Sequence, residues 1–336
     1  MQIVRLINDT WQLVDEATNT VLFQGSFEDC QMKMWAEEEN RLYRDFLLPK
    51  VSKILDLTSE VQSIIKYQIS RFPDGQQSIT LLNSHHFWTL KEEVVQIHSR
   101  LNSFTDLELI ICAKKALDGI GVRQVVLHVP YFLGARSDRK FQDGSIHYLK
   151  EVICPIINSL KFDAVVVLDP HSDVLEACLD NMVKVNNHLI VKHALTLIDN
   201  KNDARDRICL VSPDAGAYKK IFDVAQAFDI NKVITATKVR DLKTGKILHT
   251  EVPTPDMHND IKYVIVDDIC DGGRTFTEIA KAIKAIRPTA KVYLVVTHGI
   301  FSAGEEPLME HFEHVYTTNS VKEGESELIT RFNVFK

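Results

Sequence analysis

The residues that decide the fold lie at 263–276 and read Tyr263-Val264-Ile265-Val266-Asp267-Asp268-Ile269-Cys270-Asp271-Gly272-Gly273-Arg274-Thr275-Phe276. The unbroken apolar run at the start is typical of a strand that is covered on both faces, as in a parallel sheet. Two adjacent carboxylates end this strand, and a turn with two glycines follows. Glycine lets backbone N–H groups approach an anion closely, and a helix N-terminus favours negative charge. The stretch therefore predicts a phosphate site beyond the carboxyl end of a parallel strand.

The same stretch also has a purely structural interpretation. Thr275 and Glu278 have the spacing of a capping box, so the turn could cap a helix without binding a ligand. We favour the phosphate site because the strand, the paired carboxylates and the glycine turn occur together. Asp267 and Asp268 would then face ribose hydroxyls or a metal. The helix that follows has apolar residues at helical spacing, namely Phe276, Ile279, Ala280, Ile283 and Ile286.

Other apolar runs on both sides of this stretch alternate with helical segments. They occupy residues 124–129, 164–168, 208–211, 232–236 and 292–296. This alternation predicts an α/β fold with mostly parallel sheets, and a length of 336 residues suits about two domains. Because Leu168-Asp169-Pro170-His171 is a second acidic strand end, we predict two similar domains, at residues 51–195 and 196–336.

The first 50 residues have a different pattern. Apolar residues at 11–14 and 20–23 flank Asn19 and predict a hairpin, and a charged helical segment follows at 35–43. We therefore predict a small N-terminal appendage over residues 1–50, of the kind that serves docking or oligomerisation.

Composition narrows the function. A net charge of -7 argues against a protein that grips nucleic acid by its phosphates. No apolar run approaches the roughly 18 residues that a membrane helix needs, and the N-terminus shows no basic segment leading into an apolar stretch. The six cysteines include no C-x-x-C pair, which indicates free thiols in a reducing compartment. We expect a cytoplasmic protein that acts on small molecules and contacts neither nucleic acid nor membrane.

The stretch at 263–276 resembles the PRPP-binding motif of type I phosphoribosyltransferases and of ribose-phosphate pyrophosphokinases, the PRPP synthetases. Further segments resemble synthetase segments in the family's order, over roughly residues 55–320: 71–76, 130–140, 168–171, 211–216, 238–240 and 297–302. The resemblance implies two phosphoribosyltransferase-like domains and an enzyme that uses Mg²⁺. It also implies transfer of the β,γ-diphosphate of ATP to the C1 hydroxyl of ribose 5-phosphate, and a homo-oligomer, dimer-based and in some cases hexameric.

The resemblance also assigns roles to individual residues on the ATP side. Adenine would be contacted from a neighbouring subunit by Phe72, Asp74 and Gln76, and the triphosphate by Arg136, Ser137 and Arg139. His171 would lie beside ATP and Mg²⁺, and Asp214 beside a second Mg²⁺. Two arginines three residues apart suit a triphosphate because each guanidinium is a planar, bidentate donor. Several of these residues also have an interpretation without a ligand. The arginines could form a solvated basic turn, His171 could be a structural histidine, and Asp214 could cap a helix.

On the acceptor side, the resemblance implies a ribose-phosphate site built from the turn: Asp267, Asp268, Asp271, Gly272, Gly273, Arg274 and Thr275. Lys238 and Arg240 would act with Asp267 and Asp268 as the catalytic set. The glycine and polar residues after Arg240 suit a mobile loop that closes over the reaction, although both cations could also be ordinary surface charge. Closure would bring positive charge to the β-phosphorus, which is electrostatic stabilisation.

The identity of the acceptor substrate stays open, because this chain departs from the family pattern at several positions. Synthetases usually carry Asp-Thr-Gly-Gly-Thr in the turn, where this chain has Asp271-Gly272-Gly273-Arg274-Thr275. Gln76 replaces a glutamate, and Ser137 replaces a glutamine. Gly272 and Arg274 would suit a 5'-diphosphate acceptor such as ADP-ribose, giving ADP-ribose pyrophosphate in NAD synthesis or recycling, as in some synthetase-like enzymes. We rank ribose 5-phosphate first. A phosphoribosyltransferase and a non-catalytic regulatory homologue are weaker alternatives, because the arginine segment and the catalytic loop are both present.

Overall fold

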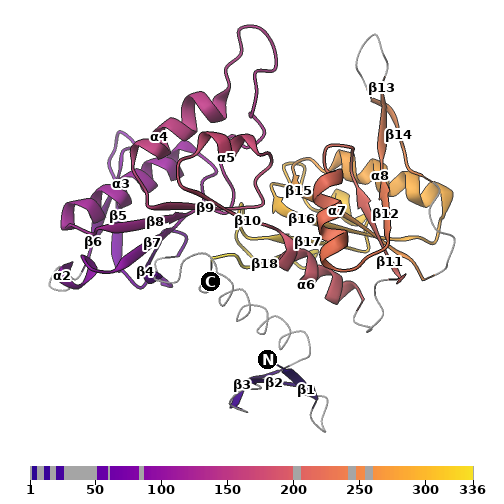
Figure 1. The fold of residues 1–336 in the computed structure, drawn as a ribbon, viewed down its shortest axis with the longest axis horizontal. Coiled ribbons are helices and arrows are strands. Elements are labelled where there is room, and N and C mark those ends of the chain that lie inside the picture. The colour runs from indigo at the N-terminus through magenta and orange to yellow at the C-terminus, as the bar shows by residue number, and fades with distance from the viewer. Residues whose placement is uncertain are drawn as a thin grey trace. The chain divides into compact units, whose positions relative to one another are not determined.

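A computed structural model describes residues 2–5, 11–15, 20–25, 51–59, 61–82, 87–199, 206–240, 247–253 and 260–335. The N-terminal unit is a three-stranded antiparallel sheet of β1 (Gln2–Arg5), β2 (Trp11–Asp15) and β3 (Thr20–Gly25) (Figure 1). Strands β2 and β3 pair antiparallel, with Trp11 opposite Gly25, which confirms the hairpin expected there. The charged helix expected at 35–43 lies outside the described residues.

The first α/β domain is built on a five-stranded sheet with the strand order β10-β9-β8-β7-β4 (Figure 1). Strands β7, β8, β9 and β10 pair in parallel with one another. Every residue of β9 is buried, as an unbroken apolar run predicts. The strands are β4 (Val51–Asp56), β7 (Val94–His98), β8 (Gln124–His128), β9 (Ala164–Leu168) and β10 (Met182–Val185). The helices are α2 (Phe87–Leu90), α3 (Phe104–Ile120), α4 (Cys154–Ser159), α5 (Val174–Cys178) and the π-helix Leu149–Ile153.

The second α/β domain is built on a six-stranded sheet with the order β12-β11-β15-β16-β17-β18, and every neighbouring pair in it is parallel. The strands are β11 (Ile208–Ser212), β12 (Lys232–Thr235), β15 (Lys262–Cys270), β16 (Lys291–Gly299), β17 (His314–Thr318) and β18 (Ile329–Phe332). The helices are α6 (His188–Ile198), α7 (Tyr218–Ala227), α8 (Arg274–Ile286) and α9 (Glu306–Met309). The two sheets confirm the expected α/β class with mostly parallel strands.

Two antiparallel hairpins form separate two-stranded sheets. They are β5 (Tyr67–Arg71) with β6 (Gln77–Leu81), and β13 (Thr237–Arg240) with β14 (Ile247–Glu251). Helix α6 spans residue 195 and packs against β16 and β17 of the second sheet. The boundary expected at residue 195 therefore falls inside a helix, and it stays a prediction.

Strand β15 is longer than its apolar run indicated. It was expected to end at the two carboxylates, but it continues past them to Cys270. The reason is its pairing with β16, which lasts until Cys270 lies opposite Gly299. On the other side, pairing with β11 ends at Ile265. Asp267 and Asp268 therefore lie within an extended strand that projects beyond its neighbour β11.

Helix α8 also differs from the sequence expectation in two details. It begins at Arg274 with Gly273 as its N-cap, so Thr275 is the second helical residue and the capping box with Glu278 is wrong. Ile286, expected on the apolar face, is 45% exposed because the buried face ends at Ile283.

Each domain has its own hydrophobic core, and a small apolar cluster joins them. Tyr131 and Ala135, which follow β8, pack against Ile269 of β15. Hydrogen bonds reinforce this junction: His298 donates from Nε2 to the Leu168 carbonyl oxygen, 3.0 Å away. The junction thus brings the end of β9 close to the carboxyl ends of β15 and β16.

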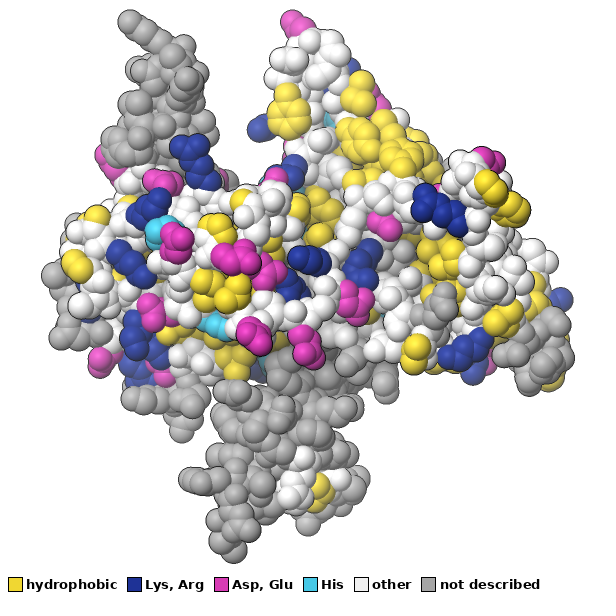
Figure 2. Space-filling model, turned by 180° about the vertical axis from the view of Figure 1, so that it is seen from behind, with side chains coloured by type: hydrophobic (Ala, Val, Ile, Leu, Met, Phe, Trp, Pro, Cys, Tyr) yellow, Lys and Arg dark blue, Asp and Glu magenta, His cyan; other side chains and the backbone are white. Residues whose placement is uncertain are grey.

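The surface of the described residues is mixed in character. On the face shown in Figure 2, Lys and Arg side chains are interspersed with Asp and Glu rather than gathered into one basic patch. Within the described ranges, no helix combines the length and the apolarity needed to span a bilayer, and no two described cysteines form a disulfide.

Burial of histidines gives a stability prediction. Burial lowers the pKa of His98, His128, His193 and His298, that of His193 to about 3. The unfolded chain takes up these protons near pH 6.5, whereas the folded chain takes them up only at lower pH, so protonation below about pH 6.5 favours unfolding. We expect the free energy of unfolding, measured in urea, to decrease as the pH is lowered from 7 to 6 and to 5. Each histidine contributes at most about 1.4 kcal/mol per pH unit.

The control is His193→Leu, which removes one titrating group from the apolar interior. It should reduce the pH dependence of the free energy of unfolding, whatever its effect on stability at pH 7. An identical pH dependence in wild type and variant would contradict the assignment.

Candidate functional site

The paired carboxylates of β15 differ in their surroundings although they are adjacent in sequence. Asp267 accepts a hydrogen bond at Oδ1 from the backbone N–H of Asp268, 2.9 Å away. Burial and the neighbouring charge of Asp268 raise the pKa of Asp267 well above its ordinary value. Burial also opposes ionisation of Asp268, but the hydrogen bond from His171 and the charge of Lys220 outweigh it and lower its pKa. One carboxylate thus holds its negative charge more firmly than the other.

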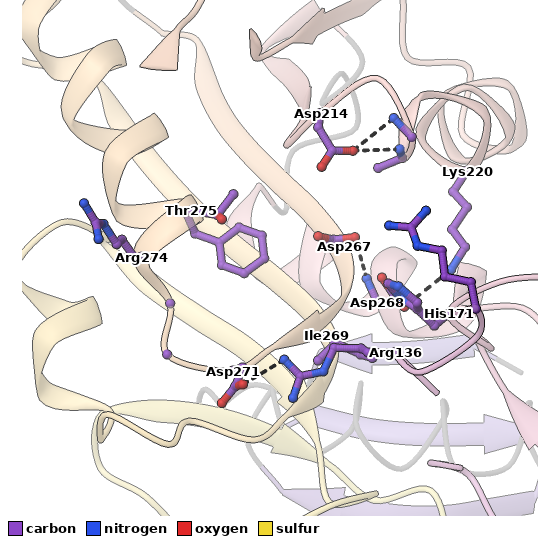
Figure 3. Close-up of a pocket in the computed structure, with 16 residues that line it drawn as sticks. Arg136, His171, Asp214, Lys220, Asp267, Asp268, Ile269, Asp271, Arg274 and Thr275 are labelled. Atoms are coloured by element: carbon purple, nitrogen blue, oxygen red, sulfur yellow. Dashed lines mark hydrogen bonds and ion pairs between the residues drawn. The ribbon is translucent and has the colours of Figure 1, made fainter. Parts of the chain in front are cut away.

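His171 is placed against Asp268 by the junction between the domains. Its Nδ1 donates to Asp268 Oδ2 at 2.6 Å, and this hydrogen bond is the main reason why the pKa of His171 is raised. A carboxylate on Nδ1 leaves Nε2 as the ring nitrogen directed to a ligand. Figure 3 shows the His171 ring lying against Asp268. The structure therefore joins residues that lie 97 positions apart in the sequence.

Lys220 of helix α7 completes this cluster, and sequence reasoning missed it. Its Nζ donates to Asp169 Oδ1 at 3.1 Å and to the Pro170 carbonyl oxygen at 3.0 Å, and it lies 3.9 Å from Asp268 Oδ2. The local sequence does not single it out, because Lys219 lies in the same first turn of α7 and Asp169 is 51 positions away.

The expected phosphate turn, residues 271–275, joins β15 to helix α8. Gly273 has φ +76°, a conformation that residues with a Cβ rarely adopt. A Cβ at Gly273 would also lie 2.6 Å from Leu308 Cδ2. The turn therefore needs glycine at this position, and it aims the uncapped N-terminus of α8 at the cavity. The first N–H groups of a helix are a ready site for an anion.

The arginine segment after β8 reaches the same place. Arg136 donates from Nη1 to Asp271 Oδ2 at 2.7 Å, and Figure 3 shows the two side chains pointing toward one another. Hydrogen bonds from Ser302 and Arg136 lower the pKa of Asp271. Arg139 also lines the cavity, with its guanidinium 5.6 Å from the centre of the Phe141 ring. Ser137 is not among the lining residues.

Asp214 lies at the cavity wall but does not act as the N-cap of helix α7. Its Oδ1 accepts hydrogen bonds from the backbone N–H groups of Gly216 (3.0 Å) and Ala217 (3.2 Å). Helix α7 begins at Tyr218, and its N-cap is Ala217. Asp214 therefore shapes the turn before α7.

These elements enclose a cavity of about 600 Å³, within the roughly 300–1,000 Å³ usual for small-molecule sites. Arginines, carboxylates and glycines line it together with Ala217, Ile269 and Phe276, and the arginines and the glycine turn suit a phosphorylated ligand. From the sequence-predicted set it gathers Arg136, Arg139, His171, Asp214, Asp267, Asp268, Asp271, Gly272, Gly273, Arg274 and Thr275.

Other predicted residues do not line this cavity. Phe72, Asp74 and Gln76 lie exposed at the turn of the β5–β6 hairpin, where Gln76 donates its backbone N–H to Asp74 Oδ1 at 3.1 Å. Their contact with adenine stays a prediction that requires a second copy of the chain. Lys238 and Arg240 belong to strand β13, but their side chains and the loop at 241–246 lie outside the described residues.

The donor set fits a magnesium ion that is held partly by its substrate. Among the described residues, no group of three or more His, Cys, Asp or Glu side chains is arranged to hold a metal. Mg²⁺ is usually held by one or two carboxylates together with substrate phosphates, not by a cage of protein ligands. His171 Nε2 and the carboxylates of Asp214, Asp267 and Asp268 border the cavity, so they are the residues that would hold such an ion.

Known proteins that are similar to this chain include a phosphoribosyl transferase domain family and several ribose-phosphate pyrophosphokinases. Residues 176–327 match the model of the phosphoribosyl transferase domain. Ribose-phosphate pyrophosphokinases of three organisms are similar in sequence. That of Marinomonas sp. is 28% identical over 58% of this chain and 59% of its own length. The Vibrio parahaemolyticus protein is 25% identical over 75% of this chain and 78% of its length. The Saccharolobus solfataricus protein is 25% identical over 83% of this chain and 91% of its length.

The fold has a solved counterpart. Phosphoribosylpyrophosphate synthetase from Mycobacterium smegmatis superposes with a TM-score of 0.69, covering 85% of this chain and 95% of that protein at 16% identity. This likeness confirms two phosphoribosyltransferase-like domains. The sequence similarity to these pyrophosphokinases confirms the resemblance that the motifs indicated.

The phosphate turn gives a prediction with a matched control. Gly273→Ala should lower the free energy of unfolding by about 1–3 kcal/mol, because it combines a left-handed backbone with a clash against Leu308. Gly272→Ala should cost less than about 1 kcal/mol, since a Cβ there meets only Ser302 Oγ at 3.8 Å. Urea unfolding of both variants measures the difference. Equal losses would contradict the strained geometry of the turn.

Proposed function

Because the chain is similar to ribose-phosphate pyrophosphokinases over most of its length, we propose that it is an ATP-dependent diphosphokinase. It transfers the β,γ-diphosphate of ATP to the C1 hydroxyl of ribose 5-phosphate and yields PRPP and AMP. One observation carries the proposal: a single cavity is lined by the phosphate turn and by Arg136, Arg139 and His171. A phosphoribosyltransferase would need only the turn.

The acceptor is held from its two ends. Its 5-phosphate binds the N–H groups at the start of helix α8, where the helix dipole favours the anion. Its ring hydroxyls bind the carboxylates of Asp267 and Asp268, which project beyond β11. Gripping both ends directs the C1 hydroxyl toward ATP, and this positioning lowers the entropic cost of the reaction.

ATP is bound through its phosphates. Arg136 and Arg139 donate to the triphosphate, so the ion pair between Arg136 and Asp271 is exchanged for a contact with substrate. The C1 hydroxyl gives up its proton to solvent and its oxygen bonds to the β-phosphorus. The bond from that phosphorus to the α–β bridging oxygen breaks, and AMP leaves with the electron pair. Lys238 and Arg240 stabilise the charge that develops, because phosphoryl transfer depends on positioning and electrostatics. Bound Mg²⁺ supplies further neutralisation of the phosphate oxygens.

ADP-ribose is the second candidate acceptor. Arg274 is exposed at the first position of helix α8 and is one of the residues that line the cavity. Figure 3 shows its side chain directed away from His171. A guanidinium there adds positive charge and bidentate donors next to the phosphate turn. A 5'-diphosphate would engage both the turn and Arg274, whereas a monophosphate needs the turn alone.

Assembly completes the ATP site in this proposal. The exposed hairpin turn with Phe72, Asp74 and Gln76 contacts the adenine of a neighbouring copy, so the active form is a homo-oligomer. Protein diluted until it is monomeric should lose activity, which sedimentation combined with the activity assay can test.

The first test of function measures AMP release from ATP and Mg²⁺ with ribose 5-phosphate or ADP-ribose as the acceptor. AMP formed with ribose 5-phosphate supports the first acceptor, and AMP formed chiefly with ADP-ribose supports the second. No AMP with either acceptor would refute the proposed activity and favour a non-catalytic homologue.

Arg274→Gln distinguishes the two acceptors more sharply. If Arg274 binds the second phosphate, kcat/KM for ADP-ribose should fall roughly tenfold or more, as expected for a lost hydrogen bond to a charged group. The value for ribose 5-phosphate should change less. An equal change for both acceptors would remove Arg274 from acceptor selection.

A further inference from the structure

We propose that Lys220 is a positioning residue, which holds the carboxylates of Asp169 and Asp268 together and thereby sets His171 in its catalytic place. The inference rests on the proposed diphosphokinase activity and goes beyond it. Lys220 connects the domain that carries the arginine segment to the strand that carries the acceptor carboxylates, and its side chain also lines the cavity.

The contacts of Lys220 join three separate segments of the chain. Its Nζ lies 3.1 Å from Asp169 Oδ1 and 3.0 Å from the Pro170 carbonyl oxygen, both just after strand β9. The same Nζ lies 3.9 Å from Asp268 Oδ2 on β15. That Oδ2 atom also accepts the hydrogen bond from His171 Nδ1. The cation therefore adjoins both the loop that carries His171 and the carboxylate that orients it.

Burial, backbone conformation and hydrogen bonds all fix Asp169 at this junction. Its side chain is almost fully buried, with 5% exposed, and its backbone has φ +40°, a strained value for a residue with a Cβ. Asp169 Oδ2 accepts from Thr297 Oγ1 at 2.6 Å and from Asn187 Nδ2 at 3.1 Å. Thr297 and Asn187 are neutral donors, whereas Lys220 brings a positive charge to the other oxygen.

The electrostatic consequence of losing Lys220 follows from burial. Asp169 and Asp268 are both about 5% exposed at the side chain, and without Lys220 they would be like charges facing a shared space. Removing one partner of a buried ion pair costs far more than the pair itself contributes, because it leaves a charge uncompensated. Asp268 and Asp169 would then move apart, and His171 would lose the fixed orientation that its hydrogen bond to Asp268 gives it.

Two lysines in the first turn of helix α7 differ in their surroundings. The side chain of Lys220 is partly buried and lines the cavity. Lys219 occupies the same turn but is exposed and does not line the cavity. The chain thus offers a neighbouring lysine with the same charge and a different environment.

The test compares Lys220→Met, Lys220→Arg and the control Lys219→Met in the full-length protein. Melting temperatures are recorded without Mg²⁺, and kcat and KM are measured for ATP and for the better acceptor. We expect kcat of Lys220→Met to fall on the order of 10- to 100-fold, the usual effect of removing an outer partner of a catalytic group. Lys220→Arg should retain part of the lost rate, and Lys219→Met should behave as wild type.

A double variant separates positioning from simple loss of folding. Asp169→Asn combined with Lys220→Met removes both charges, so its kcat should exceed that of Lys220→Met alone. Losses that simply add would show that the two residues act independently and would overturn the proposal. Wild-type kcat in Lys220→Met would overturn it as well. If Lys220→Met does not fold, the comparison of Lys220→Arg and the double variant with wild type decides.

Failure of this inference can be told apart from failure of the proposed function. A wild-type protein that releases no AMP with either acceptor refutes the activity itself. An active wild type with an unaffected Lys220→Met variant refutes only the role of Lys220. The two outcomes cannot occur in the same experiment.

Discussion

The site depends on the unequal lengths to which β15 is paired on its two sides. Strand β16 accompanies β15 to Cys270, whereas β11 leaves it at Ile265. The residues between these points are held in extended conformation by one neighbour and exposed to a cavity on the side where the other has ended. A strand alternates its side chains between two faces, so two consecutive carboxylates have different environments even though they are adjacent. The opposite pKa shifts of Asp267 and Asp268 follow from this geometry.

Negative charge at the end of a buried strand needs positive charge nearby, and the fold supplies it from other segments. His171 comes from the loop after β9, Lys220 from helix α7 and Arg136 from the loop after β8. Each pairs with an acidic residue in or beside the cavity, and an anionic substrate can exchange with such a partner. The ion pair between Arg136 and Asp271 is the most exposed of these contacts, so solvent screens it. The contacts around Asp169 and Asp268 are buried and hold the two domains in register.

The candidate site was largely accessible to sequence reasoning where its residues form compact motifs. The phosphate turn at 271–275, the paired carboxylates and Arg136 all belong to short stretches whose local order predicts their chemistry, and the structure brings them to one cavity. Lys220 was not predicted as a site residue, because its partner Asp169 lies 51 positions away and the neighbouring sequence does not indicate this pairing. Asp214 was expected as a possible cap of the helix after Pro213, but hydrogen bonds to Gly216 and Ala217 place it in the preceding turn. The capping box at Thr275 failed because the glycine turn starts the helix at Arg274.

The sequence by itself determined the α/β class, the strands and the turn, because apolar runs and glycine positions are local properties of the chain. It also determined which residue types are available to bind phosphate. Only the tertiary structure decided where β15 ends, since that depends on how far each neighbouring strand accompanies it. The tertiary structure likewise decided that Asp268 shares one cluster with His171 and Lys220. The free energy of burying a carboxylate depends on every charge around it, and those charges come from segments that are distant in sequence.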